Sequence, residues 1–253
     1  MRRLRKNSSG QVLILTALLI ALIVISAEAY VLEVNQALQV EESSSPVDFA
    51  RIVRIGSRNL MIGSLANISQ GGDNQTLRDN LERWISFVKE QYYHGECTIS
   101  FELCETSPYS SGLWMSWGAD GSGVTSAKTD FSLNLTSEGA EINVDFSINV
   151  TTSISIYAIS VWKSGIHTIN VTISLYNEGD PALAKNITVY YWTKAGWADA
   201  GLLGSYNLED FGNGTYRATF TVGAPRTWNR PILVNCYDQR EIYVQASTTC
   251  VDL

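Results

Sequence analysis

The stretch INVDFSINVTTSISIYA, residues 142–158, places an apolar side chain at nearly every second position. Successive side chains of a β-strand point to opposite faces, so this pattern predicts strands with one buried face and one face in solvent. Phe131, Leu133 and Leu135 show the same alternation upstream. Further strands are predicted over 168–176, 187–192, 214–222, 232–237 and 241–246, separated by turns at 138–139, 163–165, 177–181, 212–214 and 238–239. About eight short strands at this spacing are typical of an antiparallel β-sandwich.

Two amphipathic helices are predicted before the strands. After a break at 43–46 (Ser-Ser-Ser-Pro), apolar residues recur at helical spacing over 47–65 and 76–93, on either side of a turn at 70–73. Residues 96–125 are predicted to be irregular, with a hairpin bounded by two cysteines. The glycine-rich segment within them lacks the lysine of a phosphate-binding loop and the carboxylate spacing of a calcium loop, so a plain turn is expected.

The N-terminus has the pattern of a membrane-targeting segment. The basic cluster comprises Arg2, Arg3, Arg5 and Lys6. Residues 12–27 follow without any charge, and sixteen helical residues cover about 24 Å. Extension to Leu32 brings the length to about 31 Å, enough to span a hydrocarbon core of about 30 Å. Because cationic flanks stay on the cytoplasmic side, the bulk of the chain is predicted to lie outside the cell.

Two processing schemes are compatible with this segment. Ala27-Glu28-Ala29 is an A-x-A pattern at the end of the apolar run, so a signal peptidase that cuts after Ala29 would release the protein. On the other side of the run, Arg5-Lys6 and then Gly10-Gln11 stand directly before it. This arrangement resembles archaeal type IV pilin-like proteins and the pseudopilins of tight-adherence (Tad) systems. The resemblance implies cleavage by a prepilin-type peptidase between Gly10 and Gln11, with the hydrophobic helix retained.

The residues after Ala29 favour the retained helix. Tyr30, Val31, Val34 and Leu38 continue a helical apolar pattern, and no proline or glycine interrupts it before Pro46. A second resemblance concerns the strands: VTISLYNEGDP at 171–181, NITVY at 186–190 and GTYRATFTV at 214–222 are similar to immunoglobulin-like modules of archaeal surface proteins.

The predicted fold class is α+β, with a long N-terminal hydrophobic helix, a small helical region and an antiparallel immunoglobulin-like β-sandwich. The segments are a basic leader at 1–10, a transmembrane or filament-core helix at 11–42, a helical and irregular part of the head at 43–125, and the β-sandwich at 126–253.

Composition supports an exported protein and argues against nucleic-acid binding. The net charge is −7 and only 17% of residues are charged, whereas nucleic-acid binding requires a basic face. Seven N-x-S/T sequons lie beyond the membrane run, and they predict glycosylation where the host has the machinery. Their asparagines are Asn67, Asn74, Asn134, Asn149, Asn170, Asn186 and Asn213.

The cysteines predict disulfides rather than a metal site. An even count in an exported chain favours disulfide bonds, and proximity favours Cys97 with Cys104 and Cys236 with Cys250, although three pairings are possible. No C-x-x-C or Cys/His set suggests a metal, and no cofactor is expected. His94 and His167 stand alone, and the chain lacks a G-x-S-x-G motif, so an enzyme is not expected.

The expected function is therefore structural. A pilin-like or pseudopilin subunit would use residues 11–42 for contact with membrane lipid and for self-assembly or assembly with other pilin-like subunits. The alternative is a single-span or secreted surface protein that does not polymerise and binds a ligand through its β-sandwich. Trp192, Trp197 and Trp228 are candidates for binding glycans or protein partners, although tryptophans at such positions also serve as core or rim packing residues.

Overall fold

The computed structural model describes residues 46–137, 140–229 and 231–252. The predicted leader, the hydrophobic helix at 11–42 and both processing positions, Gly10-Gln11 and Ala27-Glu28-Ala29, lie outside these residues. No helix within the described ranges is long and apolar enough to span a membrane. The chain divides between Phe49 and Ala50, and the compact unit that begins at Ala50 contains both sheets.

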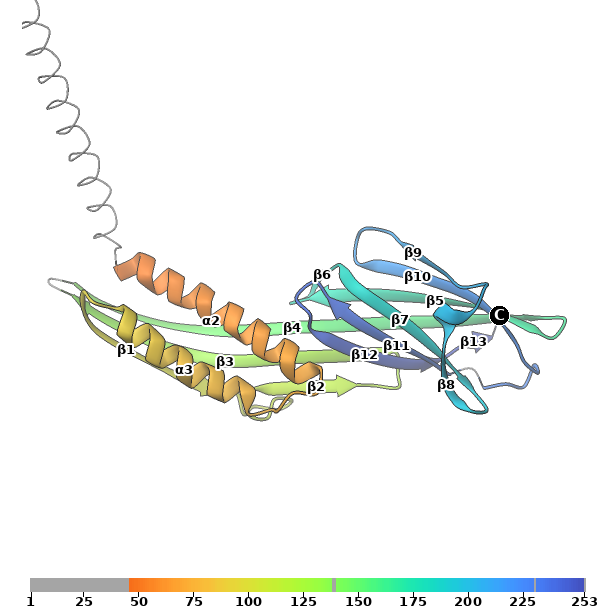
Figure 1. Cartoon of the computed structure of the whole chain (residues 1–253), viewed down its shortest axis with the longest axis horizontal. Coiled ribbons are helices and arrows are strands. Elements are labelled where there is room, and N and C mark those ends of the chain that lie inside the picture. The colour runs from red at the N-terminus through yellow and green to blue at the C-terminus, as the bar shows by residue number, and fades with distance from the viewer. Residues whose placement is uncertain (1–45, 138–139, 230, 253) are drawn as a thin grey trace, which may run out of the picture. The chain divides into compact units, whose positions relative to one another are not determined.

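The described chain consists mostly of antiparallel strands in two sheets (Figure 1). The larger, sheet A, runs β1-β3-β4-β5-β10-β9, with β2 paired to β3, β6 to β5 and β13 to β4; sheet B runs β12-β11-β7-β8. The bounds in sheet A are β1 Gly95–Leu103, β2 Leu113–Trp117, β3 Ser122–Ser137, β4 Ala140–Lys163, β5 Ile166–Asn177, β6 Asp180–Pro181, β9 Asn207–Asp210, β10 Thr215–Gly223 and β13 Val251–Asp252. Those in sheet B are β7 Ala184–Thr193, β8 Gly196–Asp199, β11 Pro231–Asp238 and β12 Tyr243–Thr249. A short 3-10 helix, η1, covers Ala200–Leu202.

Strand β4 links two differently covered halves of sheet A. Its 24 residues pair with β3 from Ala140 to Ser155 and with β5 from Thr152 to Lys163. At about 3.4 Å per residue the strand is about 80 Å long. The alternation in residues 142–158 runs through without a change of face because Thr152 occupies the inward position between Val150 and Ile154.

The predicted helices are confirmed, and they cover the first half of sheet A (Figure 1). Helix α2 spans Pro46–Ser69 and helix α3 spans Thr76–Gln91. Trp84 of α3 lies over Gly56 of α2, where an added Cβ would come within 2.4 Å of the indole ring. The same indole donates a hydrogen bond of 2.8 Å to Ser57 Oγ, so Gly56 and Ser57 together admit the tryptophan.

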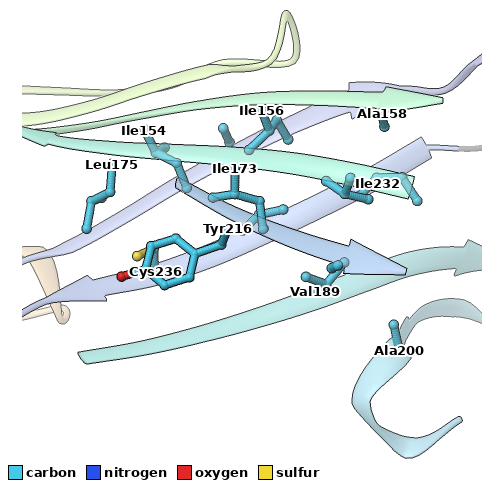
Figure 2. Packing of buried hydrophobic residues seen from close by; sticks show 14 of the residues in the cluster. Ile154, Ile156, Ala158, Ile173, Leu175, Val189, Ala200, Tyr216, Ile232 and Cys236 are labelled. Atoms are coloured by element: carbon cyan, nitrogen blue, oxygen red, sulfur yellow. The ribbon is translucent and has the colours of Figure 1, made fainter. Parts of the chain in front are cut away.

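The second half of sheet A packs against sheet B (Figure 2). Side chains from β4, β5 and β10 meet side chains from β7, β11 and β12 in one buried cluster. Ile154, Ile173, Val189 and Ile232 are each 2% exposed or less, so the cluster is closed to water. Alternate residues of these strands therefore form the apolar interior that the sequence periodicity predicts.

The prediction of an irregular segment at 96–125 is wrong in three places. Residues 95–103 form β1, which pairs with β3, residues 113–117 form β2, and residues 122–125 are the start of β3. The signal in β1 is the alternation of Cys97, Ile99, Phe101 and Leu103, which face the helices beside buried residues of β3. Sequence reasoning assigned this short run to a cysteine-bounded hairpin instead.

The glycine-rich turn joins the two sheets rather than only reversing the chain. Gly121 N donates to Ser247 O at 2.8 Å, and Ser247 N donates to Gly118 O at 3.0 Å, so the turn is hydrogen-bonded to β12. A Cβ on Gly123 would lie 2.0 Å from Gln245 O. Glycine is therefore required at this point because the two backbones approach too closely for any side chain.

A buried ionic network lies where the two halves of sheet A meet. Asp238 is 0% exposed and accepts hydrogen bonds from Thr152 Oγ1 at 2.9 Å, from Arg240 Nε at 2.8 Å and from two backbone amides of its own hairpin. Arg240 also pairs with Glu178 at 2.7 Å, and Arg58 of α2 reaches the same carboxylate at 3.3 Å. The network thus connects helix α2, strand β4 and the β11–β12 hairpin.

Candidate binding surface

An aromatic cleft opens at the end of the sandwich where β7 of sheet B and β10 of sheet A finish. It has a volume of about 330 Å³ and is lined mainly by apolar groups, with Tyr191, Trp192 and Trp228 as its rings and Pro225 in its wall. Lys194 is the one charged residue among the described residues that line it. A volume of this size is at the lower end of the range for small-molecule sites.

His167 holds the loop that carries Trp228 through a hydrogen bond and a ring contact. This histidine is fully buried in β5, with Nδ1 3.0 Å from Ser160 Oγ and Nε2 3.0 Å from the carbonyl oxygen of Pro225. A carbonyl only accepts, so Nε2 carries a hydrogen and donates it. The imidazole ring also packs edge-on against Trp228, with 5.6 Å between ring centroids. His167 therefore positions the cleft wall and does not line the opening.

The three predicted tryptophans lie at this same end of sheet B. Trp192 and Trp197 face each other across the β7–β8 hairpin in a T-shaped pair with centroids 5.1 Å apart. They are 43% and 42% exposed, so neither is a core residue, whereas Trp228 is half-buried against Tyr191. Sequence reasoning missed Tyr191 and Pro225, whose only signal was their proximity in sequence to Trp192 and Trp228.

The predicted glycosylation positions all reach the surface. Five sequon asparagines are exposed, and the other two, Asn134 and Asn170, are half-buried on the outer side of sheet A. Asn170 Oδ1 accepts a hydrogen bond of 2.9 Å from Thr219 Oγ1, which leaves its side-chain nitrogen out of that contact. Glycosylation stays a prediction. The exposed asparagines are Asn67, Asn74, Asn149, Asn186 and Asn213.

Neither short-loop cysteine pairing fits the strands. Cys97 and Cys104 lie at opposite ends of extended β1, seven residues and more than about 20 Å apart, whereas a disulfide requires Cα atoms within about 7 Å. Cys236 of β11 is opposite Val244, six residues from Cys250. Cys97, Cys104 and Cys236 are present as thiols. Burial and the carboxylate of Asp238 raise the pKa of Cys236 to about 12.

No family model matches the chain, and no curated protein matches it.

The described residues gather few groups suited to catalysis. Within residues 46–137, 140–229 and 231–252, no set of three or more His, Cys, Asp or Glu side chains is arranged to hold a metal ion. The histidines are separated in the fold, because His94 precedes β1 and packs against the ring of Tyr93, with 4.3 Å between centroids, while His167 is buried in β5. What the sandwich end offers chemically is aromatic surface with a few polar groups, which suits binding.

Proposed function

We propose that the protein is a pilin-like or pseudopilin structural subunit of a cell-surface filament, with an immunoglobulin-like head. The observation that carries the proposal is the junction Gly10-Gln11, preceded by Arg5-Lys6 and followed at once by an uncharged apolar run. A helix that is apolar on every side is stable in lipid or bundled with identical helices, because both environments bury it. The hydrophobic helix is retained after prepilin-type cleavage and carries the head outside the cell.

The described head is consistent with this role. From Ala50 onward the chain forms a unit with its own core, as a displayed domain requires. Two antiparallel sheets packed face to face support an immunoglobulin-like assignment. The accessible sequons and the low proportion of charged residues support display at the cell surface.

The mature N-terminus provides the decisive test. We expect mass spectrometry of protein from the membrane or filament fraction to find Gln11 as the first residue. Tyr30 as the first residue would overturn the proposal, and Met1 would indicate an uncleaved anchor and overturn it as well. In matched variants, Gly10→Leu is expected to block maturation, whereas Ala29→Leu leaves it unchanged. Electron microscopy of sheared cell-surface material then tests for filaments.

A second candidate function is a membrane-anchored or secreted surface protein that binds a ligand and does not polymerise. The aromatic cleft favours it, because Trp192 and Trp197 each expose about two fifths of their surface to solvent. Large exposed aromatic side chains near a cleft are typical of binding sites. Filament-free cells that retain the protein at their surface would favour this candidate over the first.

A further inference from the structure

The outer face of sheet B carries little charge. Val234, Cys236 and Val244 point into the core, so the alternate residues of the same strands point outward. We define this outer face by the outward residues Thr188, Tyr190, Trp192, Trp197, Asp199, Leu233, Asn235, Tyr237, Tyr243, Gln245 and Ser247, together with Trp117, which packs against Tyr243.

Only Asp199 is charged among these residues, in a chain with 25 acidic and 18 basic residues. Its carboxylate accepts a hydrogen bond of 2.7 Å from Gly201 N and so caps the η1 turn. The opposite side of sheet A carries Glu102, Asp130 and Asp145 on neighbouring strands. A sheet face with a single charge offers little electrostatic attraction to a charged partner.

Strand register arranges the outer face in rows. Tyr237 stands opposite Tyr243, and Trp192 stands opposite Trp197. Two rows lie between them. In the first, Asn235 is opposite Gln245 on one side and Thr188 on the other; in the second, Leu233 is opposite Ser247 and Tyr190. Successive rows are two residues, or about 7 Å, apart along the strands. The face therefore combines aromatic rings with amide and hydroxyl groups.

The aromatic rings are available to a ligand. Trp117, Trp192 and Trp197 are 41%, 43% and 42% exposed, and they come from β2, β7 and β8. Their T-shaped contacts with neighbouring rings, 5.1 Å between centroids for both Trp117–Tyr243 and Trp192–Trp197, hold them in place before binding. Rigid aromatic side chains lose little conformational entropy on binding, so such surfaces bind efficiently.

The amide row has an unmet hydrogen-bonding requirement. Asn235 Oδ1 is buried beneath its neighbours without a hydrogen-bond partner in the described structure. A buried acceptor without a donor costs free energy. The side chain of Gln245 is already oriented, because its Oε1 accepts a hydrogen bond of 2.8 Å from Tyr243.

We propose that the outer face of sheet B is a binding platform for a neutral polysaccharide. Sugar rings present apolar C–H faces that stack on aromatic rings, and hydroxyls that bond to amides and to Thr or Ser side chains; this face offers both kinds of group. A protein partner fits less well, because Leu233 is the one aliphatic side chain among the residues that define the face, and protein interfaces bury more such surface. Among the residues that define the face, an anionic polymer would meet Asp199 and no cation.

The test measures retention of the full-length protein on insoluble polysaccharides, in a detergent without a sugar headgroup. Cellulose, chitin and an insoluble β-1,3-glucan are the neutral probes, and cross-linked alginate is the anionic probe. We expect binding to at least one neutral probe and none to alginate. Retention on no neutral probe, or stronger retention on alginate, would overturn the proposal.

Single-site variants locate the binding to this face. Trp197→Ala and Trp117→Ala each remove an exposed ring from a different strand, and each is expected to weaken binding about 5- to 10-fold. Tyr157→Ala is the matched control, since Tyr157 is 58% exposed on the outer side of β4 in sheet A, and its effect should stay within about two-fold. Equal effects of all three variants would refute the assignment.

Sedimentation velocity separates a polysaccharide platform from a contact between two copies of the chain. The oligomeric mass is expected to be the same for the wild type and for Trp197→Ala. A smaller assembly in that variant, without polysaccharide binding by the wild type, would assign the face to self-association and overturn the proposal. Polysaccharide binding is independent of the proposed filament function. The N-terminal residue of the mature chain tests the filament function alone, and the retention assay tests the binding platform alone.

Discussion

Replacement of Arg240 by alanine is expected to destabilise the head by about 3–5 kcal/mol, because it leaves the carboxylate of Asp238 buried without its ionic partner. Asp238 is 0% exposed, and the side chain of Arg240 is 17% exposed, so solvent screens this pair little. The variant would also lose the 2.7 Å contact of Arg240 with Glu178 and a hydrogen bond of 3.0 Å to Thr151 O. Such a loss is a large share of a typical stability of about 5–15 kcal/mol.

The assay is urea denaturation of the full chain, monitored by tryptophan fluorescence, which measures the free energy of unfolding. In thermal denaturation, a loss of 3–5 kcal/mol corresponds to a fall in melting temperature of about 6–20 °C for a domain of this size. Lys185→Ala is the control in the same region, because its ion pair with Glu241 leaves both side chains 52% exposed and is expected to contribute less than about 1 kcal/mol. Similar losses for the two variants would refute the reasoning.

The direction of the stability change produced by a second substitution tests whether the uncompensated charge of Asp238 is the cause of the destabilisation. Adding Asp238→Asn to Arg240→Ala removes the uncompensated charge while the amide oxygen still accepts from the backbone amides of Arg240 and Ile242. The double variant is therefore expected to be more stable than Arg240→Ala alone. Further destabilisation by the asparagine would show that an isolated buried charge is not what costs stability.

Three further predictions use the same protein. Gly123→Ala is expected to lower the free energy of unfolding by about 2–3 kcal/mol, because the added Cβ would lie 2.0 Å from Gln245 O. Gly63→Ala in α2, where an added Cβ has nothing within 4 Å, is expected to raise it by about 0.5–1 kcal/mol. Urea titration that found Gly123→Ala more stable than Gly63→Ala would contradict both expectations. Cys236, with a pKa raised to about 12, is expected to resist iodoacetamide at pH 8 until urea unfolds the chain, and peptide mass mapping of native protein alkylated there would disprove this. Folding raises the pKa of Cys236 from 9.0, and that of Tyr243 from 10.0, to about 12, so the unfolded chain loses these protons at lower pH and the stability of the fold is expected to fall between about pH 9 and pH 12. Tyr243→Phe should reduce this fall above pH 10. The same dependence of melting temperature on pH in the variant and the wild type would contradict the prediction.

The strands were predictable where one face is buried and the alternation is long. The run from Ile142 to Ala158 keeps a period of two with Thr152 as its one polar inward residue, and the structure holds it in one strand. The same alternation in β1 covers only Cys97 to Leu103, and the two cysteines in this region also suggested a hairpin closed by a disulfide. The alternation alone could not show where this strand ends, because Thr152 places a polar residue at an inward position and resembles a strand boundary.

The surfaces were less predictable because they combine distant segments. Trp192, Trp197 and Trp228 could be singled out as aromatic residues near turns. Nothing in the sequence places Trp117 beside Tyr243, since this contact depends on the approach of β2 and β3 to the edge of sheet B. The buried network of Asp238 was equally hidden, because its sequence signal is that of an ordinary turn.

Strand β4 also determines how the head responds to force. Its one continuous backbone runs from the half of sheet A that the helices cover to the aromatic end of the sandwich, with no linker between them. A pull on a ligand at that end is expected to load the hydrogen bonds that join β4 to β3 and β5 in shear. In a single-molecule pulling experiment, the head is expected to resist as one mechanical element and to rupture in a single step.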